Sequence, residues 1–120
     1  MSNAHSAVDV VEAYHHAWTS GDVDLALTYV SDSVVCSAPS PEITTKADWR
    51  AYLSGFAPML TGAPELTRMT DGNRVALWYY PQTAMTDTAL ASELFTVDDG
   101  RITDIRLSFD RLSYAPPPSA

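Results

Sequence analysis

The chain has 120 residues, close to the commonest length of a single domain, and 46% of them are hydrophobic, as expected for a folded protein. Fifteen acidic residues against seven basic ones give a net charge of −8, and Lys46 is the only lysine. Because phosphate-rich surfaces require clustered cations, nucleic acids and anionic membranes are poor partners. No apolar run reaches the ~20 residues of a membrane-spanning helix.

The two ends of the chain differ in composition from the rest. Residues 1–6 are small and polar, and residues 113–120 contain three consecutive prolines, so we expect both ends to be disordered. One domain is expected over residues 7–112. The start of the chain lacks a basic segment followed by an apolar one, so we expect a cytoplasmic protein without a secretory signal. The single cysteine, Cys36, excludes an internal disulfide bond and a cysteine-based metal site.

The first part of the domain has helical periodicity. An apolar stripe predicts a first helix that ends near Gly21; its members are Val8, Val11, Tyr14, His15 and Trp18. Asp22 is a suitable N-cap for a second, short helix. A short strand is expected over residues 34–36, closed by Pro39 and Pro41. A capping box that begins at Thr45 predicts the start of a third helix, and this helix ends before Pro58.

The second part of the domain has the pattern of strands joined by tight turns. We expect strands over residues 65–69, 75–80, 89–97 and 102–109, with turns at Gly72 and Gly100. Helices followed by antiparallel strands define an α+β fold in which the helices cover one face of a curved sheet. If Trp78 points toward the helices, Val75, Leu77 and Tyr79 lie on the opposite, outer face. That apolar outer face predicts a homodimer.

Glu93 is the most informative polar residue. It alternates in phase with Ala91, Phe95 and Val97, so it shares their face of the strand. If that face is the core face, burial raises the pKa of the Glu93 carboxyl and keeps it available as a hydrogen-bond donor or general acid. The alternative is a glutamate that reaches solvent or pairs with an arginine.

Tyr14 lies on the apolar stripe of the first helix, where a buried hydroxyl needs a partner and is either a structural tether or a site donor. His15 and His16 diverge around the helix by about 100°, so no metal site is expected there. Cys36 is interpreted as a small buried hydrophobe. The chain contains no dinucleotide-binding or P-loop fingerprint, so no cofactor is expected.

Large side chains are expected to surround Glu93. They predict a pocket for a small hydrophobic molecule, and the alternative is that the same rings simply fill the core. The candidate ligand-binding residues are Trp18, Ala38, Tyr52, Phe56, Trp78, Tyr80, Phe95, Leu107 and Phe109.

Two strings carry a resemblance to a known family. Residues 14–22 (YHHAWTSGD) and 93–102 (ELFTVDDGRI), together with the order of elements, resemble the SnoaL-like branch of the nuclear transport factor 2 superfamily. The resemblance covers about residues 7–112. It implies a cone-shaped curved sheet packed on three N-terminal helices, with a pocket between them and dimerisation through the outer sheet face. The superfamily contains both enzymes and binding domains, so the fold names no activity.

The ketosteroid isomerases of this superfamily allow a comparison residue by residue. Their oxyanion-donor tyrosine corresponds to Tyr14, their second pocket tyrosine to Tyr52, and their protonated aspartic acid to Glu93. Their aspartate base corresponds to Ala38, which cannot accept a proton. Ketosteroid isomerase activity is therefore not expected, and the Asp-Arg-Asp set of limonene epoxide hydrolases has no counterpart.

Three functions remain open at this stage. The first is a cofactor-free isomerase, cyclase or hydratase acting on a small apolar carbonyl compound, with Glu93 as acid and Tyr14 as oxyanion donor. The second is a non-catalytic domain that binds such a molecule, which the alanine at position 38 favours. The third is a structural dimer module whose cavity is filled by its own side chains.

Overall fold

The computed structural model describes residues 6–39 and 43–110, and it has the predicted order of elements. The helices are α1 (Ala7–Thr19), α2 (Val23–Leu27) and α3 (Lys46–Phe56), and a short 3-10 turn, η1 (Ala57–Met59), follows α3. The strands are β1 (Val30–Ser37), β2 (Glu65–Asp71), β3 (Arg74–Tyr79), β4 (Ala91–Asp98) and β5 (Arg101–Ser108). The predicted disordered ends lie outside the described residues, except for Ser6.

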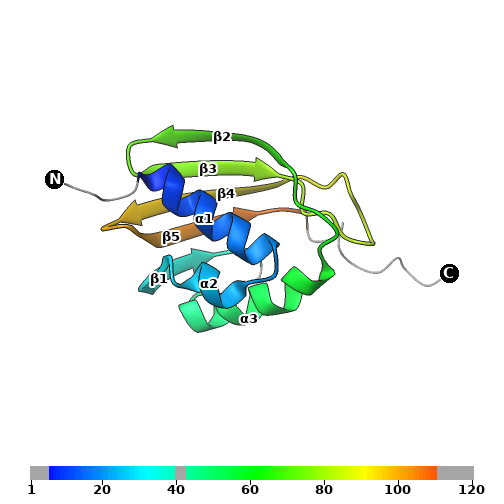
Figure 1. Ribbon diagram of the computed structural model, residues 1–120, viewed down its shortest axis with the longest axis horizontal. Coiled ribbons are helices and arrows are strands. Elements are labelled where there is room, and N and C mark those ends of the chain that lie inside the picture. The colour runs from blue at the N-terminus through cyan, green and yellow to red at the C-terminus, as the bar shows by residue number, and fades with distance from the viewer. Residues whose placement is uncertain (1–5, 40–42, 111–120) are drawn as a thin grey trace.

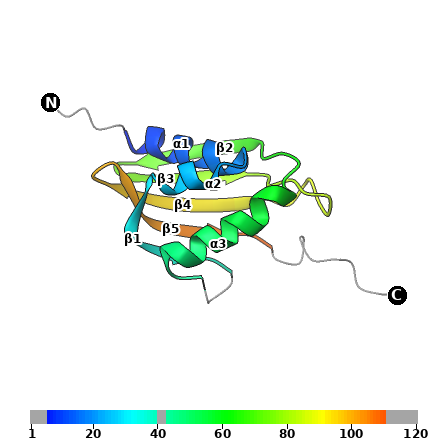
Figure 2. The ribbon, with the colours of Figure 1, turned by 60° about the horizontal axis from the view of Figure 1, so that its bottom comes forward.

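The strands form one curved sheet in the order β1-β5-β4-β3-β2. In Figure 1, α1 and α2 lie across this sheet, and Figure 2 shows α3 running past β5. The predicted α+β class is confirmed, but the sheet is mixed, because β1 pairs with β5 in parallel while the other pairs are antiparallel. The parallel pair arises because the chain leaves β1, crosses through α3 and builds three strands before β5 returns beside it.

Side chains at the ends of the helices satisfy backbone groups there. The Ser6 hydroxyl accepts a hydrogen bond from Asp9 N, and the Asp22 carboxylate accepts one from Leu25 N, as predicted for an N-cap. The predicted capping box between Thr45 and Asp48 is present at the start of α3. These caps set where α1, α2 and α3 begin, and therefore which side chains the helices present to the sheet.

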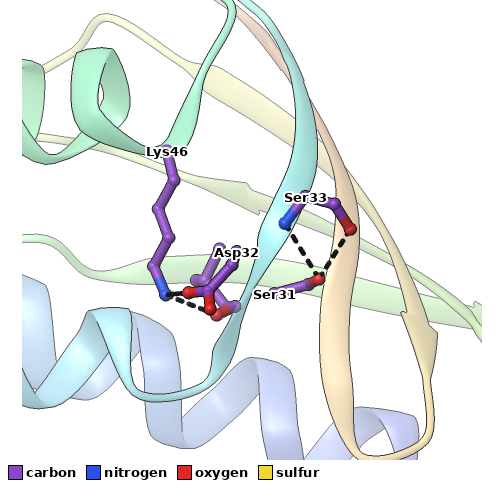
Figure 3. A network of polar contacts seen from close by, with 5 residues as sticks. Ser31, Asp32, Ser33 and Lys46 are labelled. Atoms are coloured by element: carbon purple, nitrogen blue, oxygen red, sulfur yellow. Dashed lines mark hydrogen bonds and ion pairs between the residues drawn. The ribbon is translucent and has the colours of Figure 1, made fainter.

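A polar network at the protein surface ties the start of α3 to β1 (Figure 3). The Lys46 ammonium donates to the backbone oxygen of Val30 at 2.8 Å and to the Asp32 carboxylate at 2.9 Å. The hydrogen bond from Lys46 lowers the pKa of Asp32. Because Asp32 is exposed, the network positions α3 but contributes little to stability.

Tight turns set the register of the antiparallel strands. Asp98 pairs with Arg101 across the β4–β5 hairpin, and both central residues, Asp99 (φ 52) and Gly100 (φ 77), have left-handed conformations. This is the backbone of a type I′ hairpin, which the Asp-Gly pair predicts. Beyond the turn, the register of β4 against β5 shifts by one residue between Thr96 and Val97. This shift places Glu93 opposite Leu107 on β5, and the neighbouring ladder places Glu93 opposite Leu77 on β3.

The predicted faces of β3 are wrong. Val75, Leu77 and Tyr79 are buried against the helices, whereas Trp78 is half-buried on the opposite face. The strand is apolar at nearly every position, so alternation alone did not distinguish its faces, and the register with β4 decides them. The outer face therefore carries Trp78, Ala76 and Leu94 rather than the residues first assigned to it.

Candidate functional site

The Glu93 carboxyl lies inside the protein, on the face that its strand pattern predicts. Its residue is 2% exposed, and the buried positions of β4 alternate from Ala91 through Glu93 and Phe95 to Val97. The Tyr79 hydroxyl donates a hydrogen bond of 2.6 Å to Glu93 Oε1. Tyr79 reaches Glu93 diagonally, since its direct partner in the ladder is Ala91. Neither alternative for Glu93, exposure to solvent or an arginine partner, is realised.

Burial changes the acidity of this carboxyl. Desolvation raises the pKa of Glu93 from 4.5 to about 7, and the hydrogen bond from Tyr79 partly opposes the rise. The Glu93 carboxyl is therefore poised between its protonated and ionised forms near neutral pH, which is the range in which a general acid or base works best. Burial, followed by the charge of Glu93, also raises the pKa of Tyr79 well above its usual value, so the Tyr79 phenol remains a donor.

Unpartnered polar atoms gather around this carboxyl. Among the described residues, the buried side-chain nitrogen and oxygen atoms without a hydrogen-bond partner are Glu93 Oε2, Trp18 Nε1 and both ring nitrogens of His15. The His15 ring contacts Tyr79 edge-on at 4.6 Å and Trp18 at 5.8 Å between ring centroids, so these residues form one cluster. An unpartnered buried polar group costs about 1–3 kcal/mol, and such a concentration is therefore unusual outside a site.

Desolvation dominates the ionisation of His15 as well. Burial lowers the pKa of His15 from 6.5 to about 4, and the neighbouring His16 adds a smaller effect in the same direction. The exposed position of His16 and the buried position of His15 agree with the divergence predicted for adjacent helical residues. His15 is therefore a neutral ring at physiological pH, packed behind the Tyr79–Glu93 pair.

A pocket opens beside Glu93 between α1, α3 and the sheet. Its lining is almost entirely apolar and aromatic, formed by Trp18, Trp49, Tyr52, Leu53, Phe56, Tyr79, Pro81, Ala91, Glu93, Leu107 and Phe109. Only about 10 Å³ is open to the centre of a water-sized sphere, which is room for about one water molecule. A ligand larger than water therefore requires the surrounding side chains to move.

The sequence predicts Tyr14 as an oxyanion donor, a role that requires its hydroxyl to reach the ligand, but the hydroxyl is engaged elsewhere. Its hydroxyl accepts a hydrogen bond of 2.7 Å from Trp49 Nε1, and its ring packs edge-on against Phe95 at 5.6 Å. Burial, followed by the charge of Glu93, raises the pKa of Tyr14 well above its usual value. Tyr14 is fully buried but is not one of the residues that line the pocket.

The structure brings together five of the predicted ligand-binding residues, which all line the pocket: Trp18, Tyr52, Phe56, Leu107 and Phe109. Phe95 is buried behind them against Tyr14. Ala38 is half-buried beside the core and does not line the pocket. Trp78 and Tyr80 do not line it either. The prediction for them is wrong because β3 turns Tyr79, and not Trp78, toward the helices.

Sequence reasoning missed Tyr79 as the partner of Glu93. It also omitted Trp49, Leu53, Pro81 and Ala91 from the candidate site. Trp49 and Leu53 share the helical spacing of Tyr52 and Phe56, so the pattern of α3 carried a signal for them. Nothing in the uniformly apolar sequence of β3 singled out Tyr79.

The structure also describes the environment of Cys36, the grouping of metal-binding side chains and the length of the helices. Cys36 is buried, and desolvation raises the pKa of its thiol to about 11, so it behaves as a small hydrophobe at neutral pH. Residues 6–39 and 43–110 hold no group of three or more side chains suited to binding a metal ion. Within the same residues, no helix is long and apolar enough to cross a membrane.

Comparisons with known proteins agree with this architecture. Residues 11–105 match the SnoaL-like domain family. A crystal structure from Kribbella flavida is 38% identical, covers 91% of this chain and 90% of its own, and superposes with a TM-score of 0.85. An NTF2-like protein of unknown function from Cytophaga hutchinsonii is 19% identical over 92% of this chain and 95% of its own, with a TM-score of 0.75.

A third solved structure, a proposed polyketide cyclase from Sinorhizobium meliloti, is 16% identical over 87% of this chain and all of its own, with a TM-score of 0.73. At 16% sequence identity, the similarity shows a shared fold and nothing about a shared activity. No curated protein matches the chain. The family match over most of the domain shows that this chain belongs to the SnoaL-like domain family.

Proposed function

We propose that the protein is a cofactor-free enzyme that acts on a small apolar carbonyl compound, with Glu93 as its acid. One observation carries the proposal: a fully buried carboxyl with one oxygen bonded to Tyr79 and the other unpartnered, beside an aromatic pocket. Keeping such a group in the interior is costly unless it is used. The protonated carboxyl donates to the carbonyl oxygen of the ligand, which makes the carbonyl carbon more electrophilic and its α-hydrogens more acidic.

The missing base limits which residues can handle protons in the reaction, and three reaction types remain compatible with it. Ala38 supplies no base at the position where ketosteroid isomerases carry an aspartate, so Glu93 itself is the residue available to return or accept a proton. Isomerisation, cyclisation and hydration each need one such acid at a carbonyl oxygen. The similarity to a proposed polyketide cyclase supports a carbonyl substrate only through the shared fold.

Substitution of Glu93 by glutamine tests the proposal. The amide keeps the size of the side chain and an oxygen that accepts from Tyr79, but it cannot transfer a proton. We expect Glu93→Gln to retain the fold, measured by circular dichroism, and to lose turnover of small cyclic ketones and β-diketones. Unchanged turnover in a folded Glu93→Gln protein would contradict the proposal.

A non-catalytic binding domain is the second candidate, and Ala38 favours it because the corresponding position supplies no base. In that case an apolar carbonyl compound raises the melting temperature and is recovered unchanged, and Glu93→Gln weakens its binding. If no compound binds, the aromatic rings serve only to fill the core, as in a structural module.

We also propose that two copies associate through the outer sheet face. Its apolar row joins Met69 on β2, Ala76 on β3 and Leu94 on β4, with half-buried Trp78 beside it. Met69 is 63% exposed in the single chain, which supports a partner on this face. Light scattering after gel filtration tests this, because Leu94→Glu is expected to convert a dimer of 26 kDa (twice 13.1 kDa) into a monomer.

A further inference from the structure

The three tryptophans have three different environments, and one of them leaves a donor unused. The Trp49 indole N–H donates to the Tyr14 hydroxyl. Trp78 lies on the outer face of β3, away from the pocket. The Trp18 residue is 2% exposed and lines the pocket, yet its indole nitrogen has no hydrogen-bond partner. An indole N–H only donates, so it needs an acceptor that residues 6–39 and 43–110 do not provide.

Glu93 lines the same pocket and carries a second unpartnered atom, Oε2. Trp18 belongs to α1 and Glu93 to β4, so the helix layer and the sheet each contribute one. Tyr79 occupies Glu93 Oε1, which leaves Oε2 for a ligand and makes Oε2 the natural position for the proton of the neutral carboxyl. Among the described residues, the remaining lining is apolar or aromatic and includes no lysine or arginine.

These two atoms discriminate between classes of ligand. A cation would satisfy an ionised Glu93 but leave the Trp18 N–H unpartnered. An anion would accept from Trp18 but face the Glu93 carboxyl, and none of the described lining residues is basic. An uncharged carbonyl compound accepts from the Trp18 N–H and from the protonated Glu93 carboxyl, so it leaves neither polar atom unpartnered.

We propose that Trp18 is a substrate-binding donor, and that the ligand is a flat, uncharged ketone or aldehyde that accepts a hydrogen bond from its indole N–H. This inference rests on the proposed function, because it names the ligand class of the same pocket. It replaces Tyr14 by Trp18 as the donor that acts beside Glu93. Tyr14 instead has the role of holding Trp49 in the pocket wall.

A matched pair of ligands isolates the hydrogen bond. 1-Indanone and indane have the same flat ring system and differ by one carbonyl oxygen. Titration of ¹⁵N-labelled protein with each compound at pH 6 follows the three indole N–H signals separately, assigned by single Trp→Phe variants. We expect 1-indanone, and not indane, to move the Trp18 N–H proton signal downfield. The Trp49 and Trp78 signals are internal controls and show no difference specific to the ketone.

Binding constants for two variants complete the test. Trp18→Phe keeps an aromatic ring but removes the donor, and we expect the preference for 1-indanone over indane to fall roughly fivefold, the effect of one hydrogen bond. Glu93→Leu removes the other donor. If Trp18→Phe fails to fold, the Trp18 N–H signal of the unaltered protein decides the question.

The outcomes separate the two proposals. If the ketone preference is lost in Glu93→Leu but kept in full by Trp18→Phe, or if the Trp18 signal responds equally to both compounds, the inference about Trp18 is overturned and the role of Glu93 stands. If Trp18→Phe loses the preference and Glu93→Leu keeps it, Trp18 stands and the proposed acid falls. If the protein binds neither compound, or binds both without preference, both proposals are overturned.

Discussion

Burial shifts the pKa values of Glu93 and His15 in opposite directions, and the two shifts should compensate in the free energy of unfolding. The folded state favours protonated Glu93, whose pKa rises from 4.5 to about 7. It favours neutral His15, whose pKa falls from 6.5 to about 4. Between pH 4.5 and 6.5, the folded protein therefore retains a proton on Glu93 that the unfolded chain releases, and lacks one on His15 that the unfolded chain binds.

The sign of each effect follows from this proton balance. The contribution of Glu93 is fully present below pH 4.5 and is lost as the pH rises through about 7. The contribution of His15 is present above pH 6.5 and is lost as the pH falls through about 4. Each pKa difference is about 2.5, which corresponds to about 3 kcal/mol, since one pKa unit is worth about 1.4 kcal/mol.

Two variants separate the contributions of Glu93 and His15 to the free energy of unfolding, which compensate in the unaltered protein. Relative to the unaltered protein, Glu93→Gln should gain about 3 kcal/mol of stability between pH 4.5 and 8, because it cannot ionise. His15→Phe, which keeps a ring against Trp18 and Tyr79, should gain about 3 kcal/mol as the pH falls from 7 to 4. For a domain of this size, such a gain raises the melting temperature by about 10 °C.

Urea unfolding of the three proteins at half-unit steps from pH 4 to 8 measures these differences. Subtracting the curves at each pH cancels the contribution of every other titrating group. His16→Phe, at the exposed neighbouring position, controls for the loss of a histidine as such. A difference between Glu93→Gln and the unaltered protein that is the same at every pH would refute the argument from burial, and so would a constant difference for His15→Phe.

Three further predictions concern the contacts around the pocket. Tyr79→Phe should raise the pKa of Glu93 further, because the hydrogen bond from Tyr79 opposes the effect of burial; a ¹³C titration of the Glu93 carboxyl measures it, and a lower pKa would contradict it. Trp49→Phe should cost about 1–3 kcal/mol by leaving the Tyr14 hydroxyl without its donor, whereas Trp78→Phe on the outer face should cost less; equal urea midpoints would argue against this. Gly100→Ala should destabilise the β4–β5 hairpin by about 1 kcal/mol because the residue has a φ of 77; an unchanged melting temperature would show that the turn relaxes.

Much of the fold could be predicted because its signals are local. The apolar stripe of α1 lies within one 13-residue helix, and the caps at Asp22 and Thr45 and the Asp99–Gly100 turn each depend on only a few neighbouring residues. These signals define the order of helices and strands and the α+β class. The parallel pairing of β1 with β5 was not predictable in this way, because it joins segments that are far apart in the sequence.

Part of the candidate site could also be predicted from local sequence patterns. Alternation along β4 placed Glu93 on the same face as Phe95, and helical spacing placed Trp18 on the buried stripe of α1. The sequence offered burial of Glu93, with its effect on the pKa, as one of two alternatives, and the structure decides between them. The residues around Glu93 were harder to predict, since each belongs to a different element.

Tertiary structure alone decided which side chains bond to one another. The sequence of β3 is apolar on both faces, so only its register with β4 turns Tyr79 toward Glu93 and Trp78 away from it. Only the approach of α3 to α1 lets Trp49 Nε1 donate to the Tyr14 hydroxyl, while the Trp18 N–H has no partner among the described residues. Local sequence determines which face of an element is apolar, but hydrogen bonds in the core depend on distances between elements, and those distances are set when the layers pack together.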